Sequence, residues 1–345
     1  MRALVLGGAG FIGLHLASRL LTEGHTVTIV DDFSRGRDDE WLAALRTHPD
    51  VEVLSADLTD AAAWSGLPRG CDQIYLLAAV VGVRNVEADP ARVIRVNTLT
   101  ALHLLDWLAP GDRVFFSSTS EVYAGGVDLR TVAVPTAEDV PVTIADVTAP
   151  RFAYAISKLL GEAAFVHTAR ARGCAAVVGR FHNVYGPRMG ADHVIPEMTL
   201  RALRGEDPFR VWGAEQYRAF CHVDDAVEAM LRLMATPAAA GEIVHIGNDS
   251  EQTNIGDLAK LVLRLTGVSP RLRMVPAPPG SVHRRCPDLG KLRRLTGFEP
   301  AVPLEEGVRS TIDWYRSSLV TAPTAVRREG SAHPDKERIR ARQRA

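Results

Sequence analysis

A glycine-rich turn between a short apolar run and an amphipathic helix constrains the fold more than any other feature of this 345-residue sequence. Residues 2–6 form the apolar run, Gly7-Gly8-Ala9-Gly10-Phe11-Ile12-Gly13 follows, and a helical pattern extends to about Glu23. Glycines let the backbone approach a pyrophosphate, which then lies at the positive end of the helix. Strand, glycine turn and helix in this order predict a dinucleotide-binding unit.

A second apolar run, residues 26–30, ends at Asp31, where a carboxylate meets the adenosine ribose hydroxyls of a dinucleotide. A carboxylate at this point repels a 2′-phosphate, so the sequence predicts NAD rather than NADP. Arg35 and Arg37 weaken this preference, because either guanidinium could reach a phosphate.

Further apolar runs alternate with helical patterns along the chain. Strands are predicted at 51–54, 73–79, 113–117 and 175–180, and helices at 88–109 and near 196–203. This alternation predicts an α/β fold with a Rossmann-type, doubly wound parallel sheet. Ligands bind at the carboxyl ends of such strands, where Asp57, Leu58, Ala78, Ala79 and residues 117–119 fall. Each of these residues has an alternative reading as a cap or turn residue.

The chain divides by composition into three parts. Residues 1–180 are expected to form the NAD-binding domain, with later strands interleaved. Residues 181–318 are richer in arginine, proline and loops, and we expect a smaller C-terminal substrate-binding lobe there. Residues 319–345 are polar and basic, which predicts a disordered tail. The prolines between 124 and 150 predict a loop.

Tyr154 and Lys158 stand four residues apart in a predicted helix, so both side chains share one helix face. A lysine beside a tyrosine favours the phenolate, so we expect the pKa of Tyr154 to lie below its ordinary ~10, where the phenol can take a proton from an alcohol. Such pairs also occur by chance on amphipathic helices. The dinucleotide unit that accompanies this pair favours dehydrogenase chemistry.

Charge and composition exclude several function classes. A net charge of -1 gives no reason to expect a nucleic-acid or anionic membrane partner. The sequence lacks an apolar run long enough for a membrane span or a signal peptide, which predicts a cytoplasmic protein. Four widely separated cysteines predict reduced thiols and no metal site: Cys71, Cys174, Cys221 and Cys286.

Nine ordered segments carry a family resemblance. They are residues 7–13, Asp31-Asp32-Phe33-Ser34, Asp57-Leu58, Leu77-Ala78-Ala79, Asn97, residues 117–123, residues 154–162, residues 180–187 and residues 218–225. Over about residues 1–316 the chain resembles the extended short-chain dehydrogenases/reductases of the nucleotide-sugar epimerase, dehydratase and decarboxylase group. The resemblance implies NAD as cofactor, a nucleotide-diphosphate sugar as substrate, and a homodimer formed through a helix bundle that includes the Tyr154 helix.

The resemblance also implies residue roles. The cofactor would contact Gly7, Gly10, Phe11, Ile12, Gly13, Asp31, Asp32, Ser34, Asp57, Leu58, Ala78, Ala79, Asn97, Tyr154 and Lys158. Tyr154 would remove the proton of the sugar 4-hydroxyl, Lys158 would hold the nicotinamide ribose, and Thr119 would hydrogen-bond the same hydroxyl. The product of this step is a 4-keto sugar. The substrate would contact Ser120, Asn183, Arg218 and Arg285.

Glu121 bears on the reaction that follows oxidation. Thr119-Ser120-Glu121 and Arg218-Ala219-Phe220 resemble segments of the decarboxylases, which predicts decarboxylation of a nucleotide hexuronate such as UDP-glucuronate. The alternative is a 4-epimerase acting on UDP-glucose or UDP-glucuronate, which Ser157 favours. A 4,6-dehydratase is disfavoured for deoxythymidine diphosphate sugars because Ser120 is a poor acid, although GDP-mannose-type dehydratases share the triplet. Glu121 could also merely fix a loop.

Two readings lie outside this group. A non-sugar NAD(P) reductase would share the glycine turn and the Tyr154/Lys158 pair, but it would have no use for residues 183–187 or for the phosphate-facing arginines. A non-catalytic NAD-sensing protein typically loses the tyrosine or the lysine, and this chain has both.

Overall fold

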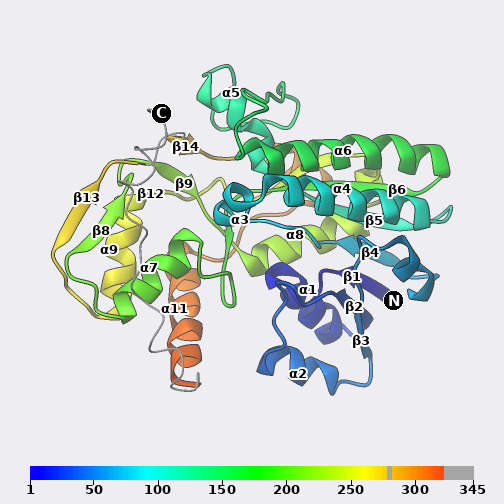
Figure 1. The fold of residues 1–345 in the computed structure, drawn as a ribbon, viewed down its shortest axis with the longest axis horizontal. Coiled ribbons are helices and arrows are strands. Elements are labelled where there is room, and N and C mark those ends of the chain that lie inside the picture. The colour runs from blue at the N-terminus through cyan, green and yellow to red at the C-terminus, as the bar shows by residue number, and fades with distance from the viewer. Residues whose placement is uncertain (278–281, 322–345) are drawn as a thin grey trace, which may run out of the picture.

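The computed structural model describes residues 1–277 and 282–321 and contains a seven-stranded sheet with helices on both faces (Figure 1). All strand pairs in this sheet are parallel, in the order β11-β6-β5-β4-β1-β2-β3. The strands are β1 (Arg2–Leu6), β2 (Thr26–Asp31), β3 (Val51–Ser55), β4 (Gln73–Leu76), β5 (Arg113–Thr119), β6 (Ala175–Phe181) and β11 (Ile243–Ile246). The predicted Rossmann-type doubly wound sheet is confirmed.

Alternating side chains of the strands bury two separate faces. Val5 and Ile29 belong to the core on one face, and Leu4 and Leu6 belong to the core on the other. The helices of the first face are α1 (Phe11–Thr22), α2 (Glu40–Arg46), α8 (Val223–Ala235) and α10 (Gly290–Thr296). The second face is covered by η1 (Ala61–Gly66), α4 (Pro90–Trp107) and α6 (Phe152–Arg172).

A smaller lobe has its own core, which includes Phe209, Leu258 and Val308. Its elements are α7 (Val194–Leu203), β8 (Phe209–Trp212), β9 (Tyr217–Ala219), β12 (Gln252–Asn254), α9 (Ile255–Thr266), β13 (Leu272–Val275), β14 (Arg284–Arg285) and α11 (Leu304–Thr321). Figure 1 places this lobe at the end of the molecule away from β1 to β3. Because α8, β11 and α10 return to the large sheet, the two parts are interleaved in sequence.

Short elements complete the description: α3 (Val83–Ala88), η2 (Ser120–Tyr123), α5 (Ala124–Asp128), β7 (Val184–Tyr185), β10 (Cys221–His222) and η3 (Pro237–Ala239). Helix α5 corrects the prediction of a continuous loop over 124–150. Its turn packs closely, since a Cβ at Gly125 would lie 2.1 Å from the carbonyl oxygen of Thr143. Helix α11 includes residues 319–321, and the remaining residues of the predicted tail lie outside the described range.

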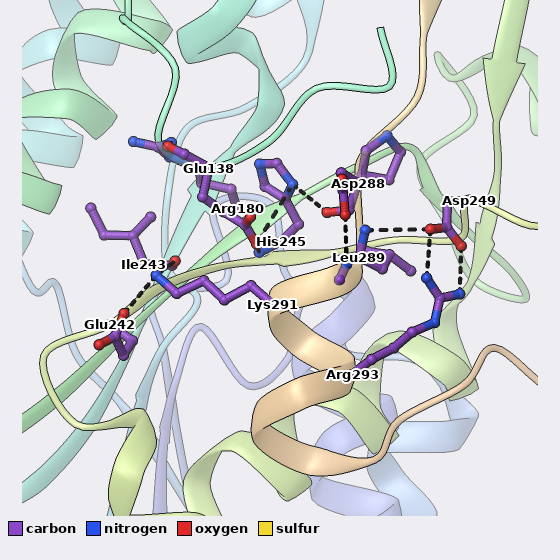
Figure 2. Close-up of polar contacts among 12 residues, drawn as sticks. Glu138, Arg180, Glu242, Ile243, His245, Asp249, Asp288, Leu289, Lys291 and Arg293 are labelled. Carbon is purple, nitrogen blue, oxygen red and sulfur yellow. Dashed lines mark hydrogen bonds and ion pairs between the residues drawn. The ribbon is translucent and has the colours of Figure 1, made fainter.

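Helix α10 is fixed to the edge strand β11 by polar contacts (Figure 2). Lys291 Nζ donates to the carbonyl oxygen of Ile243 (2.9 Å) and pairs with Glu242 (2.5 Å). His245 Nδ1 donates to the carbonyl oxygen of Asp288 (3.0 Å). Because Arg285 lies only a few residues before this helix, the anchored segment limits where Arg285 can reach.

All four cysteines are free thiols within the described residues. The helices at 1–277 and 282–321 include none with the length and hydropathy needed to cross a bilayer.

Candidate active site

The glycine turn lies between β1 and α1, near the middle of the sheet. Gly7 has φ +85°, and a Cβ there would lie 2.4 Å from the main-chain nitrogen of Ala78. A Cβ at Gly13 would lie 2.4 Å from the carbonyl oxygen of Gly7. Both positions therefore require glycine. The bare backbone forms part of the wall of two cavities.

The first cavity, which we call the β2–β3 cavity, has a volume of about 240 Å³. The predicted residues in its wall are Gly7, Gly10, Asp31, Asp32, Ser34, Asp57, Leu58, Ala78 and Ala79. They follow β1, β2, β3 and β4, so they gather at the carboxyl edge of the sheet as strand order requires.

Asp31 joins this cavity to the glycine turn. Its Oδ2 accepts from the main-chain nitrogen of Ala9 (3.0 Å), and its Oδ1 accepts from that of Phe33 (2.9 Å). Burial raises the pKa of Asp31, and these two hydrogen bonds oppose the rise. Asp32 accepts from both the main-chain nitrogen and the hydroxyl of Ser34 (2.9 and 2.7 Å). The two carboxylates therefore shape the loop as well as lining the cavity.

The two arginines of the β2 loop lie in different places. Arg37 stacks over Trp314, 5.4 Å from the ring centroid, and shares a hydrogen bond with Tyr315. Arg35 lines the cavity and donates to the carbonyl oxygen of Val81. Arg37 is thus held by α11, whereas Arg35 is directed across the cavity.

The second cavity, which we call the Tyr154 cavity, has a volume of about 480 Å³. The predicted residues in its wall are Gly7, Gly10, Phe11, Ile12, Gly13, Ala79, Thr119, Tyr154 and Lys158. Tyr154 and Lys158 come from α6, and Thr119 from the end of β5. Thr119 shares a hydrogen bond with the Tyr154 phenol, and its Oγ1 accepts from the main-chain nitrogen of Glu121 (3.2 Å).

The electrostatics of Tyr154 correct one prediction. Burial, followed by the charge of Glu121, raises the pKa of Tyr154 above its ordinary value, although the Thr119 hydrogen bond opposes the rise. Lys158 Nζ lies 5.9 Å from the Tyr154 ring centroid. Burial lowers the pKa of Lys158 to about 7. The expected lowering of the Tyr154 pKa is wrong for the protein alone, because desolvation penalises the charge on both side chains.

A buried ion pair lies behind Lys158. Arg180 Nη2 is 2.6 Å from Glu162 Oε2, and both side chains are almost fully buried. Ser118 donates to the same carboxylate, and Arg180 also donates to the Tyr123 hydroxyl. Glu162 acts to raise the pKa of Lys158, but much of its charge is balanced by Arg180. This arrangement explains why burial dominates at Lys158.

Three of the predicted residues, Glu121, Arg218 and Arg285, lie close together. Arg285 Nη1 is 2.7 Å from Glu121 Oε1, and Arg218 is paired with Arg285 in the β9/β14 register. Burial acts to raise the pKa of Glu121, but Arg285, Arg151 and Arg218 together lower it, so the carboxylate is ionised. Burial and the neighbouring Arg285 lower the pKa of Arg218 to about 10. The cluster has more cations than anions.

The remaining predicted residues lie outside the walls of the β2–β3 cavity and the Tyr154 cavity. Asn97 accepts from the Val80 nitrogen (2.7 Å) and donates to Ser157 (3.1 Å), so it links the β4 loop to α6. Asn183, with φ +42°, donates to the carbonyl oxygen of Ala219 (3.0 Å). Ser120 lines a separate small cavity of about 10 Å³ together with Arg285.

The loop at residues 188–193 lines the Tyr154 cavity, although none of its residues was predicted to belong to the site. Arg188 in this loop is buried and donates to the carbonyl oxygens of Ala9 and Gly10 (2.9 and 3.0 Å). It also pairs with Asp39 (2.6 Å), so it ties the glycine turn to the β2 loop. This loop follows β6 and therefore lies at the carboxyl edge of the sheet, a position that could have indicated from sequence that it lines the site.

The two cavities fit an extended nicotinamide dinucleotide. They share the backbone of the glycine turn, where side chains would collide with neighbouring main-chain atoms. Carboxylates lie at the end of β2, where ribose hydroxyls need acceptors, and Tyr154 and Lys158 lie in the other cavity. The donor and acceptor groups present therefore suit an adenosine ribose on one side and a redox-active ring on the other.

Known proteins similar to this chain include nucleotide-sugar enzymes. The sequence profile of the NAD-dependent epimerase/dehydratase family matches residues 3–247. UDP-glucuronic acid decarboxylase 1 of Xenopus tropicalis is 32% identical over 324 residues, which cover 92% of this chain and 73% of that protein. UDP-N-acetyl-alpha-D-glucosaminuronate decarboxylase of Bacillus cytotoxicus is 33% identical over 327 residues, which cover 91% of this chain and 98% of that protein.

Solved structures with the same fold include two enzymes with bound NAD. UDP-glucuronic acid 4-epimerase from Bacillus cereus, in complex with UDP-glucuronic acid and NAD, superposes with a TM-score of 0.82 at 25% identity, covering 92% of this chain and all of that one. A dTDP-glucose 4,6-dehydratase from Streptomyces venezuelae with NAD bound gives a TM-score of 0.81 at 27% identity, covering 93% of this chain and 98% of that one.

Proposed function

Because this chain belongs to the NAD-dependent epimerase/dehydratase family, we propose that it oxidises the 4-hydroxyl of a nucleotide hexuronate and decarboxylates the resulting ketone. UDP-glucuronate is the substrate we favour. The main support for an anionic sugar is the cationic cluster that Arg218 and Arg285 form around the carboxylate of Glu121. Any nucleotide sugar supplies the anions of its diphosphate to such a cluster, and the carboxylate of a hexuronate adds a further anion that a neutral sugar lacks.

The names of the related enzymes support the same reaction. Both relatives at about one-third identity are decarboxylases of nucleotide hexuronates by name, and they align with nearly the whole described chain. The Thr119-Ser120-Glu121 segment adds a chemical reason, because Ser120 offers no acid for a departing hydroxyl. Decarboxylation needs no such acid.

The cofactor would be held by the residues of the two cavity walls. We assign Asp31 and Asp32 to the adenosine ribose and the glycine turn to the pyrophosphate. When bound, NAD supplies the hydride acceptor and, in its oxidised form, a positive charge in the Tyr154 cavity. A positive charge there acts against the raised pKa of Tyr154 and favours the phenolate.

The chain's own residues then move protons. The Tyr154 oxygen accepts the proton of the sugar 4-hydroxyl, with Thr119 holding the same oxygen in place. A 4-ketone turns the C6 carboxylate into a β-keto acid. The C5–C6 bond breaks, its electrons pass into the enolate of the ketone, and carbon dioxide leaves. C5 then takes up a proton from water, which the Glu121 carboxylate is placed to relay. Tyr154 returns its proton to the 4-oxygen when C4 is reduced again.

Product mass after incubation with UDP-glucuronate tests this proposal. We expect a product lighter by one carbon dioxide, with UDP-glucose unconverted under the same conditions. A product of unchanged mass with inverted configuration at C4 would instead identify a 4-epimerase. This is the alternative reaction, because the fold is similar to that of the Bacillus cereus UDP-glucuronic acid 4-epimerase. Loss of water would identify a dehydratase. Either result, or no reaction with any nucleotide hexuronate, would refute decarboxylation.

We also propose that the protein forms a homodimer through α4 and α6. Ile94 and Leu102 on α4 are each 40% exposed, and Leu160 on α6 is 43% exposed. Helices α4 and α6 pack side by side on one face of the sheet (Figure 1). Ile94 and Leu102 are eight residues apart and so share one helix face. An exposed apolar surface on paired helices suits a second copy of the same surface.

We expect Leu102→Glu to convert a dimer into monomers, because each interface would bury two carboxylates. Light scattering after gel filtration measures the mass directly. Met274→Glu is the matched control, since Met274 is 53% exposed on β13 in the other lobe. A parent protein that is monomeric at micromolar concentration, or a control that dissociates equally, contradicts this interface.

A further inference from the structure

Arg35 reaches from the loop that follows β2 to the loop that follows β4. The sheet order places β1 between β2 and β4, so the glycine turn after β1 lies between the loops that follow β2 and β4. Arg35 belongs to the β2 loop, and its guanidinium donates to the carbonyl oxygen of Val81 in the β4 loop. The side chain must therefore pass over the glycine turn to make this contact.

The cavity walls lead to the same position. The residues that line both the β2–β3 cavity and the Tyr154 cavity are Gly7, Gly10, Arg35, Leu77 and Ala79. Arg35 is the charged member of this shared set of described residues. An extended dinucleotide places its pyrophosphate between its two nucleoside halves, at the glycine turn. The Arg35 guanidinium is thus at the junction where the phosphate charges fall.

The charge of Arg35 is not neutralised by a carboxylate of its own. Within the described part of the chain no carboxylate oxygen lies within ion-pair distance of Arg35. Asp192 is the acidic group that acts on it most, but Asp192 is already paired with Arg84 at 2.7 Å. Arg92 adds a like charge nearby. A guanidinium with one main-chain acceptor retains donors for an anion.

The backbone of the β4 loop lies beside this side chain. Gly82 has φ +96°, and a Cβ there would lie 4.0 Å from Arg35 Nη2. The guanidinium consequently lies against the bare backbone of the β4 loop. The Arg35 side chain is exposed, as expected for a group at the rim of an open groove.

We propose that Arg35 is a cofactor-binding residue. Its guanidinium binds the pyrophosphate, holds the dinucleotide in its groove and so slows release of the cofactor. This inference rests on the NAD-dependent redox cycle proposed above. In such a cycle the reduced cofactor must stay bound between oxidation of C4 and its later reduction. Escape of the reduced cofactor would leave a 4-keto product and an enzyme unable to finish the reaction.

The rate at which NADH leaves the protein tests this role of Arg35, and the measurement needs no sugar substrate. Arg35→Gln removes the charge but keeps a donor for the Val81 carbonyl. We expect the release rate of NADH, followed by stopped-flow fluorescence, and its dissociation constant to rise about ten- to hundredfold, as loss of a charged hydrogen bond implies. Added salt should speed release from the parent protein more than from the variant.

Arg46→Gln is the matched control. Arg46 pairs with Asp38 (2.9 Å) and packs over Phe33 in the same region, but it lines neither cavity. We expect parental release rates for this variant. Equal release from the parent and Arg35→Gln overturns the proposal, as does an equal acceleration by Arg46→Gln. Weaker NADP binding with unchanged NADH release would assign Arg35 to a 2′-phosphate and also overturn it.

The measurement separates this inference from the proposed function. NADH release requires no knowledge of the sugar, so an incorrect substrate leaves the expected result intact. Conversely, if the enzyme decarboxylates its substrate but releases NADH at the same rate with and without Arg35, the role of Arg35 is refuted and the proposed reaction is not.

Discussion

Tyr154→Phe is expected to lower kcat by about a hundred- to ten-thousandfold while the protein still folds and binds NAD. The substitution removes the phenol oxygen to which we assign the 4-hydroxyl proton, and it leaves the ring that forms part of the cavity wall. Thr119 still accepts from the Glu121 nitrogen, so the end of β5 keeps its local geometry. Turnover is measured with the nucleotide hexuronate that the parent enzyme converts, and NAD affinity by titration.

Tyr75→Phe is the matched control for this variant. Tyr75 is a fully buried phenol on β4 and lines neither the β2–β3 cavity nor the Tyr154 cavity. Its loss should affect stability by only one hydrogen bond and leave kcat near the parental value. Parental turnover in Tyr154→Phe would remove the proton-transfer role of this tyrosine.

Glu121→Gln is expected to let oxidation proceed and to slow the later steps by about a hundredfold or more. The amide cannot form the ion pair with Arg285, and it cannot relay a proton from water to C5 after carbon dioxide has left. Since Glu121 raises the pKa of Tyr154, its neutralisation lowers that pKa, so oxidation itself should not suffer. A 4-keto sugar and reduced cofactor should therefore accumulate, which mass analysis and the reduced-nicotinamide absorbance detect.

Glu197→Gln provides the control for loss of an arginine-paired carboxylate. Glu197 lies in the first turn of α7 and contacts Arg201 at 3.5 Å, and it lines neither the β2–β3 cavity nor the Tyr154 cavity. We expect it to turn over at the parental rate. If Glu121→Gln also forms product at the parental rate, Glu121 only fixes the loop between Thr119 and Arg285.

The cofactor side of the site was accessible from sequence because its signals are local. The glycine turn, Asp31, Asp57 and Ala78 each follow a strand within a few residues. Parallel strand order then brings these ends to one edge without any knowledge of side-chain packing. Asn97 shows the limit of this approach, because its motif match did not reveal that its amide is occupied by Val80 and Ser157.

The substrate side depended on contacts between distant segments. Glu121 and Arg285 are separated by 164 positions and meet because β14 pairs with β9 and because α10 anchors the following chain to β11 (Figure 2). Arg188 reaches the glycine turn across a separation of 178 residues to Gly10. Spacing in the sequence carries no information on such pairs.

The sequence by itself determined the parallel sheet, the dinucleotide turn and the presence of a tyrosine and a lysine on one helix face, since hydrophobic period, glycine placement and helical spacing are local properties. The tertiary structure decided the charge state of that pair and the course of Arg35 over the glycine turn. Both depend on burial and on which distant groups lie nearby: desolvation raises the pKa of Tyr154 and lowers that of Lys158, and strand order sets β2 and β4 on either side of β1.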